Sequence, residues 1–286
     1  MLLGALPWRS GQRLGAVIGR LLWWARSRMA RTTLANVELC FPELAPSARR
    51  RLARASLEET GRLLLETAGL WGRHGARWQD LLGSIDGRHI VDEVRNAGSG
   101  VLVLAPHFGN WELLNFFLGN AFEATVLYEP PQDPRLEALL KRSRSRHGSR
   151  PVPTTPAGIR SVLRTLRQSG VVGLLPDQVP ERESGIHVSF FGVPALTMTL
   201  VHRLLIKTSA RAVVGAAIRR SDGRFDLVFE SPAPDIYDAD VEIATRAVNA
   251  AVESMVRRDC KQYQWEYKRF KREPTGSSPR YPPPSP

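Results

Sequence analysis

Hydrophobic positions divide the chain into a helical N-terminal region and a longer region of alternating strands and helices. Residues 1 to about 80 carry apolar residues at helical spacing. Beyond residue 85, short apolar runs predict strands at 101–105, 124–128, 171–175, 211–218 and 225–230. Helices are predicted at 110–120, 135–147, 157–168, 196–208 and 240–258. This order favours an α/β fold with a mixed, largely parallel central sheet flanked by helices, preceded by a helical N-terminal region.

The first 35 residues predict an amphipathic helical segment. No run of about 18 uncharged apolar residues occurs, and the best stretch, 14–25, is interrupted by Arg20. Arginines fall on one helical face and aliphatic residues on the other: Arg9, Arg13, Arg20 and Arg31 against Leu14, Ile18, Leu21 and Leu22. Such a helix is typical of a segment lying in the membrane interface, and packing on the protein core is the alternative.

Length and composition predict one folded domain with acidic partners. The chain of 286 residues can bury one large core, which we expect over 36–273, followed by a disordered Pro- and Ser-rich tail at 274–286. A net charge of +12 suits nucleic acid, an anionic membrane or an acidic protein. Cys40 and Cys260 lack metal-binding spacing, and the histidines form no ligand cluster. We therefore expect no metal and no cofactor.

The most informative motif is His107-Phe108-Gly109-Asn110-Trp111-Glu112, which lies between a predicted strand and a predicted helix. Open α/β sheets place their ligands at the carboxyl ends of strands, where this histidine falls. We expect Glu112 to fold back toward His107, because a histidine held by a carboxylate can take a proton from a hydroxyl. Free N–H groups near Gly109 and Asn110 are candidates for binding an oxyanion. A structural histidine and a dipole-favoured glutamate are the alternatives.

Further candidates follow other predicted elements. Asp177 and Gln178 come after the strand at 171–175, so the shared sheet edge can bring Asp177 near His107, although a turn-forming aspartate is equally compatible. Arg160 begins a helix beside the same edge and suits a phosphate. The basic helix 135–147 carries Arg144 and Arg146, which suit phosphates or an acidic carrier protein, or form a solvated face.

Ordered blocks along residues 36–271 resemble the late acyltransferases of lipid A biosynthesis. They are NVELCFPEL (36–44), HFGNWE (107–112), YEPP (128–131), GIR (158–160), LPDQ (175–178), FFGVPA (190–195), QW (264–265) and KRFK (268–271). A His-x4-Glu motif alone is weak evidence, whereas the ordered set is specific. Members of that family usually begin with a membrane-spanning helix, which is short and interrupted here.

The resemblance implies an O-acyltransferase that moves a fatty acyl chain from acyl carrier protein to a hydroxyl of a Kdo-modified lipid A precursor. It implies that His107 is the general base and Glu112 its partner, in a protein at the cytoplasmic face of the inner membrane, peripheral or monotopic. One alternative is an acyl-CoA-dependent glycolipid acyltransferase of the phosphatidylinositol mannoside type. A basic nucleic-acid-binding protein is another, but no such motif occurs, so we expect no nucleic acid partner.

Overall fold

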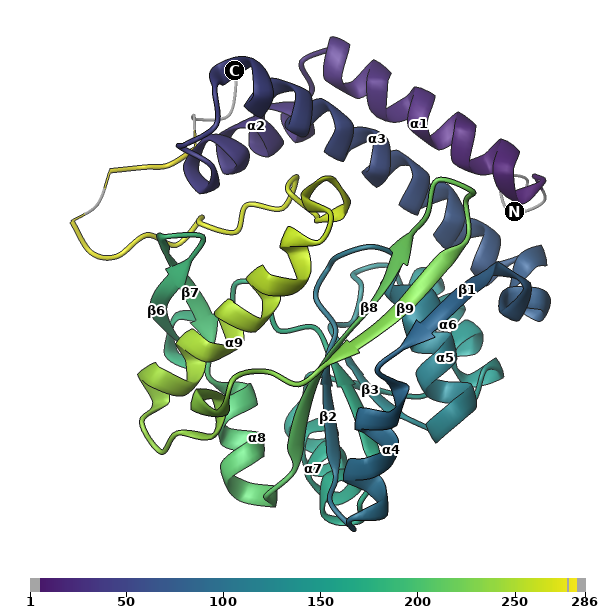
Figure 1. Cartoon of the computed structure of the whole chain (residues 1–286), viewed down its shortest axis with the longest axis vertical. Coiled ribbons are helices and arrows are strands. Elements are labelled where there is room, and N and C mark those ends of the chain that lie inside the picture. Colours follow the sequence, from purple (N-terminus) through teal and green to yellow (C-terminus); the bar gives the residue numbers. More distant parts are fainter. Residues whose placement is uncertain (1–5, 277, 282–286) are drawn as a thin grey trace.

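The computed structural model describes residues 6–276 and 278–281 and confirms the α/β fold. In these residues seven strands form one sheet in the order β1-β9-β8-β2-β5-β3-β4 (Figure 1). Their bounds are β1 Leu82–Asp86, β2 Val101–Leu104, β3 Thr125–Tyr128, β4 Arg150–Pro153, β5 Val171–Leu174, β8 Arg211–Arg219 and β9 Phe225–Glu230. Only β8 and β9 pair antiparallel among these neighbours. A separate antiparallel hairpin joins β6 (Gly185–Phe190) and β7 (Val193–Met198).

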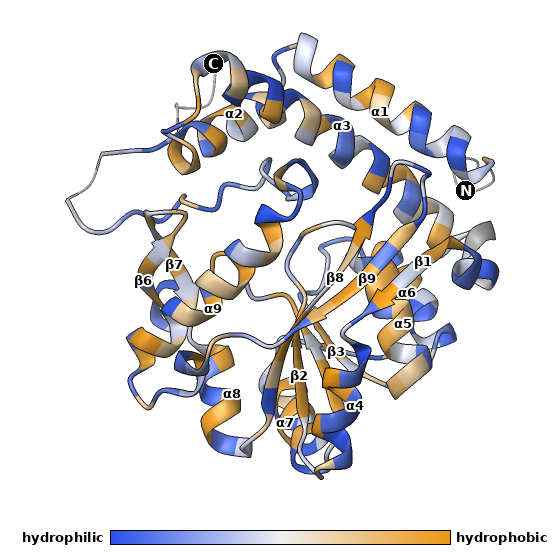
Figure 2. Ribbon diagram, viewed as in Figure 1, coloured by the Kyte–Doolittle hydropathy of each residue, from blue (hydrophilic) through white to orange (hydrophobic). Residues whose placement is uncertain are grey.

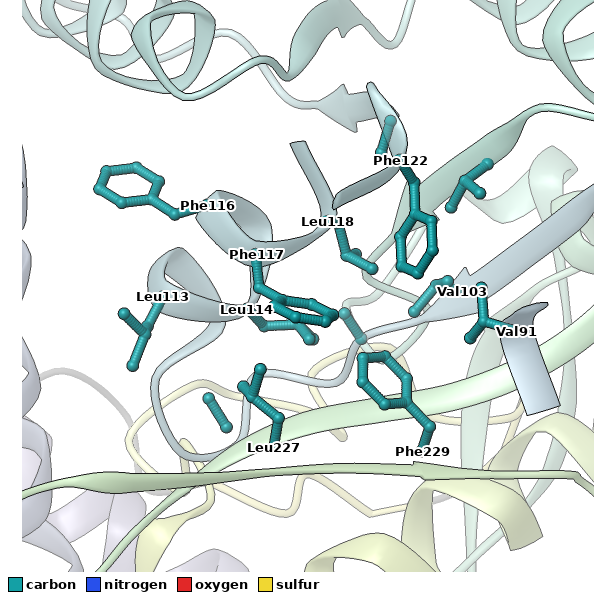
Figure 3. Close-up of a cluster of buried hydrophobic side chains, with 14 of the residues drawn as sticks. Val91, Val103, Leu113, Leu114, Phe116, Phe117, Leu118, Phe122, Leu227 and Phe229 are labelled. Carbon is teal, nitrogen blue, oxygen red and sulfur yellow. The ribbon is translucent and has the colours of Figure 1, made fainter. Parts of the chain in front are cut away.

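Alternating side chains of the central strands form two hydrophobic cores. On β2, Val101 and Val103 pack toward α4 (Arg88–Asn96) and α5 (Trp111–Phe122). Figure 3 shows part of this core, where Phe117 of α5 lies against Phe229 of β9. On the opposite face, Leu102 and Leu104 belong to a core that includes residues of three further helices. These are α7 (Pro156–Arg167), α8 (Leu200–Thr208) and α9 (Val241–Arg257). α6 (Pro134–Arg146) contacts α5 and β4.

Sequence patterns missed four strands, and two of these are the edges of the sheet. β1 is mostly exposed, and β4 contains two prolines, which an edge strand tolerates because one side needs no hydrogen bonds. Neither therefore shows the apolar run of a buried strand. The helix predicted at 196–208 begins only at Leu200, because residues 196–198 complete β7.

Three helices form an N-terminal layer: α1 (Trp8–Trp24), α2 (Arg28–Cys40) and α3 (Pro46–Trp71) (Figure 1). The backbones of α1 and α3 touch, since a Cβ on Gly15 or on Gly61 would overlap the carbonyl group of the other. The glycine face of α1 therefore packs on the protein, as the packing alternative expected, and other residues of α1 face outward. No helix in residues 6–276 and 278–281 is long and apolar enough to cross a membrane.

The C-terminal residues that the structure describes contact the domain. Tyr281 accepts a hydrogen bond from the backbone N–H of Phe270 at 3.0 Å, and its hydroxyl donates to Asn36 of α2. Arg280 donates to the carbonyl of Pro194 at 2.6 Å. The predicted disordered tail thus includes ordered contacts at Arg280 and Tyr281. Residues 1–5 of the predicted membrane segment, and 277 and 282–286 of the predicted tail, lie outside the described residues.

Candidate active site

The register of β2 and β5 places His107 beside Asp177. Leu104 is the partner of Leu174 across this parallel pair. Each strand then continues through one apolar residue and one proline, so that His107 and Asp177 are both the third residue beyond the paired leucines. Parallel strands in register end at the same edge of the sheet, and their extensions meet there. The predicted proximity of Asp177 to His107 is confirmed.

Hydrogen bonds hold the His107 ring in one orientation. Its Nδ1 lies 2.8 Å from Oδ1 of Asp177, and its backbone N–H donates to Oδ2 of the same carboxylate at 2.9 Å. Its Nε2 lies 3.0 Å from the amide nitrogen of Gln178. Because a carboxylate only accepts, Nδ1 carries the proton and donates, and Nε2 accepts from the amide. The basic lone pair of the neutral ring is therefore on Nε2, as a general base requires.

Asp177 remains ionised in this buried position. Burial opposes its charge, but the nearby His107 and the two hydrogen bonds from that residue outweigh burial and lower the pKa of the Asp177 carboxyl. Arg269 adds a smaller effect in the same direction. An ionised carboxylate at Nδ1 stabilises the imidazolium that forms when Nε2 takes a proton.

The expected pairing of Glu112 with His107 is wrong in the structure. Glu112 is buried in the first turn of α5, where Arg144 of α6 donates to both of its carboxylate oxygens. The indole N–H of Trp71 donates to one of them at 3.2 Å. The five-residue spacing turns Glu112 toward α6 and α3, and Asp177 occupies the position at Nδ1 that the sequence assigned to Glu112.

Gly109 and Asn110 shape the turn, but their N–H groups already have acceptors. Gly109 has φ of +62°, and a Cβ there would overlap the carbonyl of Ala217. Its N–H donates to Gln262 at 3.1 Å, and the Asn110 N–H donates to Ala217 at 2.8 Å. The side chain of Asn110 caps α5 at the N–H of Leu113. These two N–H groups therefore do not form the predicted oxyanion site.

The Asn110 side chain also links the turn to the N-terminal layer. Its Nδ2 donates to the buried carboxylate of Glu66 on α3 at 3.0 Å. Arg219 of β8 donates to both oxygens of that carboxylate, and Gln12 of α1 donates to one at 2.7 Å. Burial disfavours the charge of Arg219, but Glu66 and Glu59 outweigh this and raise the pKa of the guanidinium. Gln12 and Glu66 were not found from the sequence, because they lie far along the chain from His107.

His107 opens onto a cavity of about 1110 Å³, large enough for a small-molecule ligand. Apolar side chains from several elements line it: Leu127, Leu140, Ile159, Leu163, Leu174, Leu175, Met198, Leu200 and Leu204. Cationic side chains also line it: Arg144, Arg203, Lys207 and Lys271. Buried Nη1 of Arg144 has no hydrogen-bond partner within the described residues. The lining thus combines hydrocarbon surface with positive charge next to a base.

The other predicted site residues lie outside this lining. Arg160 is exposed on α7, next to Ile159, which does line the cavity. Arg146 is exposed at the end of α6, so of the two arginines proposed there, Arg144 alone lines the cavity. Phe190 and Phe191 of the FFGVPA block are buried against Tyr263 and Trp265 and do not line the cavity. Among the described residues, no group of three or more potential ligands could hold a metal ion.

The fold and the site define an α/β protein in which a hydrogen-bonded pair, His107 and Asp177, lies at a large, partly apolar cavity. Residues 1–272 match the family model described as bacterial lipid A biosynthesis acyltransferase, and the chain belongs to this family. It is therefore an acyltransferase that transfers groups other than aminoacyl groups.

Curated relatives cover nearly the whole chain. The lipid A biosynthesis lauroyltransferase of Escherichia coli K12 is 29% identical over 283 residues, which is 96% of this chain and 90% of the relative. The palmitoleoyltransferase of the same strain is 26% identical, over 95% of this chain and 87% of the relative. A lipid A biosynthesis acyltransferase of Haemophilus influenzae is 27% identical, over 96% of this chain and 88% of the relative. The family resemblance read from the motifs is confirmed.

Proposed function

We propose that this acyltransferase moves a fatty acyl chain from acyl carrier protein to a hydroxyl of a Kdo-modified lipid A precursor, at the cytoplasmic face of the inner membrane. The observation that carries the chemistry is the hydrogen-bonded pair of His107 and Asp177 at the apolar cavity. Names of the relatives support lipid A as the pathway. A net charge of +12 suits an acidic carrier protein and a phosphorylated acceptor.

In the proposed reaction, Nε2 of His107 removes the proton of the acceptor hydroxyl. The hydroxyl oxygen attacks the thioester carbonyl and forms a tetrahedral intermediate. The carbon–sulfur bond then breaks, and His107 returns the proton to the departing thiolate, which leaves an ester and a free carrier thiol. The Gln178 amide must yield its place at Nε2 to the hydroxyl. The chain uses no covalent acyl-enzyme and no cofactor in this scheme.

Two parts of the cavity suit the two parts of the donor. The leucine-rich lining accommodates the hydrocarbon chain, because burying apolar surface stabilises the complex. Arg144 lines the same cavity, and its Nη1, which is buried and has no partner within the described residues, is proposed to turn toward the carbonyl oxygen as that oxygen gains negative charge. Glu112 then acts through Arg144, by holding its guanidinium in place.

Lipid A composition tests this function directly. Cells that lack the protein are expected to make lipid A with one acyl chain fewer, detected by mass spectrometry, and the intact chain restores it. Complementation with His107→Ala is the matched control and should not restore the missing chain. Unchanged lipid A together with a changed glycolipid of another type would contradict the proposed acceptor.

Arg160 is proposed to hold a phosphate of the acceptor, because it is exposed and directly follows Ile159, which lines the cavity. Arg160→Lys is expected to raise the acceptor KM with a smaller effect on the donor KM, because an ammonium cannot bind phosphate through two parallel hydrogen bonds. Steady-state kinetics with each substrate varied in turn measures this. Arg164→Lys, also exposed on α7, is the matched control. A raised donor KM with an unchanged acceptor KM would assign Arg160 to the donor.

A further inference from the structure

A second, smaller cavity lies between the N-terminal layer and the turn joining β8 to β9. Its volume is about 390 Å³, and none of its lining residues lines the active-site cavity. In Figure 1 the β8–β9 turn reaches the N-terminal layer. Arginines dominate the lining: Arg9, Arg13, Arg20, Arg62, Arg219 and Arg220. Asp222 is the one acidic residue among the described residues that line it. We refer to this as the arginine cavity.

Hydrogen bonds fix the walls of the arginine cavity. The indole N–H of Trp8 and the amide of Gln12 each donate to the carbonyl of Gly223 at 3.0 Å, which ties α1 to the turn. Arg219, whose side chain is buried, also lines the cavity and forms ion pairs with Glu59 and Glu66. The cavity is therefore built by contacts between distant parts of the chain.

Positive charge in the arginine cavity exceeds the nearby negative charge. Besides Arg219, three of the lining arginines form ion pairs with carboxylates. Arg20 pairs with Glu58, Arg62 with Glu59, and Arg220 with both Asp222 and Asp226. Arg9 and Arg13 are exposed and have no ion pair within the described residues. An anion bound here would gain charge-assisted hydrogen bonds from guanidinium groups. Phosphate is well matched to that geometry.

An exposed apolar stripe on α1 adjoins the arginine cavity. Its members recur at helical spacing and are 40–75% exposed: Leu14, Val17, Leu21 and Trp24. Val17 also lines the cavity, so the apolar stripe and the arginines are continuous. Figure 2 shows apolar and polar segments alternating along α1. Exposing such a surface to water is unfavourable. In a bilayer the apolar side chains can be buried while the neighbouring arginines contact charged headgroups.

We propose that the arginine cavity binds the phosphate of an anionic phospholipid while the apolar stripe enters the hydrocarbon region. The excess of positive charge favours an anionic ligand. The adjoining apolar stripe favours a ligand that carries acyl chains, because its side chains can then be buried in hydrocarbon. The site goes beyond the proposed acyl transfer and does not depend on it, because its lining is separate from that of the catalytic cavity.

Vesicle co-sedimentation of the full chain tests the site. The protein is mixed with phosphatidylcholine vesicles with or without phosphatidylglycerol. Arg9→Gln/Arg13→Gln is expected to weaken binding to the anionic vesicles by roughly 30-fold, since each surface arginine contributes about a factor of five. The matched control is Arg164→Gln/Arg167→Gln, which removes the same charge from exposed positions on α7 and should leave binding unchanged. Thermal unfolding checks that both variants fold.

A second variant separates the apolar contribution from the electrostatic one. Leu21→Ser/Trp24→Ser should weaken binding to both kinds of vesicle, while added salt should weaken only the anionic contribution. Equal losses in the α1 and α7 arginine variants would overturn the site, because only net charge would then matter. Release of the protein by millimolar glycerol phosphate would assign the cavity to a soluble phosphate instead. Unchanged vesicle binding with a raised acceptor KM in detergent micelles would assign it to the acceptor.

Discussion

Replacing His107 with alanine is expected to lower kcat for acyl transfer by roughly 10²- to 10⁴-fold, the usual contribution of a general base. His107 lines the cavity and is bonded to Asp177, so the alanine variant lacks the proposed base at this position. Folding should persist, because His107 lies on a turn at the end of β2 and not in a packed helix. Single-turnover assays with purified protein, together with a thermal unfolding curve, measure both effects.

Two companion variants show how His107 acts. Asp177→Asn should also lower kcat strongly, because the neutral amide no longer stabilises the imidazolium. Gln178→Ala should lower kcat much less, because the substrate hydroxyl displaces the Gln178 amide from Nε2 in the proposed reaction. Near-normal turnover by His107→Ala would place the base elsewhere. Equal losses in the Asp177 and Gln178 variants would contradict the tautomer deduced from the hydrogen bonds.

Glu112→Ala is expected to destabilise the fold by about 3–5 kcal/mol, because it leaves the buried guanidinium of Arg144 without its counter-ion. Urea-induced unfolding measures this loss. Activity should fall as well, since Arg144 lines the cavity and loses its fixed position. Glu112→Asp should lose less stability and less activity, because it keeps the negative charge that pairs with Arg144.

A double variant separates stability from chemistry at this pair. Glu112→Leu/Arg144→Met replaces both charges by apolar groups and should recover much of the stability. Activity should remain low, because the donor at Nη1 is absent. A double variant that is both stable and active would show that the pair only supports the fold. A Glu112→Ala protein as stable as the parent would contradict the buried ion pair.

Sequence patterns predicted the central strands well because these strands are buried on both faces. The run Val101–Leu104 is apolar throughout, so its type follows from composition alone. β1 and β4 lie at the edges and carry polar residues or prolines, which removes that signal. The hairpin of β6 and β7 is not part of the main sheet, and the helix predicted at 196–208 included the last residues of β7.

The position of His107 at the candidate site could be predicted from the sequence, but its hydrogen-bond partners only in part. His107 followed from one local motif, and Asp177 followed from its position after the strand predicted at 171–175, at the same sheet edge. The partner of Glu112 depends on how α6 packs against α5, which no local spacing contains. For the same reason the sequence could not say that Arg144 turns inward while Arg146 stays exposed.

The shared carboxylate of Glu66 limits how this enzyme can be prepared for inhibitor discovery. Shortened, detergent-free proteins are attractive for such screens, and α1, with its exposed apolar stripe, is the obvious segment to delete. That deletion would remove the hydrogen bond that Gln12 donates to Glu66. The same Glu66 carboxylate accepts a hydrogen bond from the side chain of Asn110, which lies on the turn that follows His107. It would also uncover the α3 surface at Gly61. Compounds selected against the shortened protein would therefore bind a protein in which the contacts of the turn beside His107 are changed. A protein that keeps α1, studied in nanodiscs, is the better target.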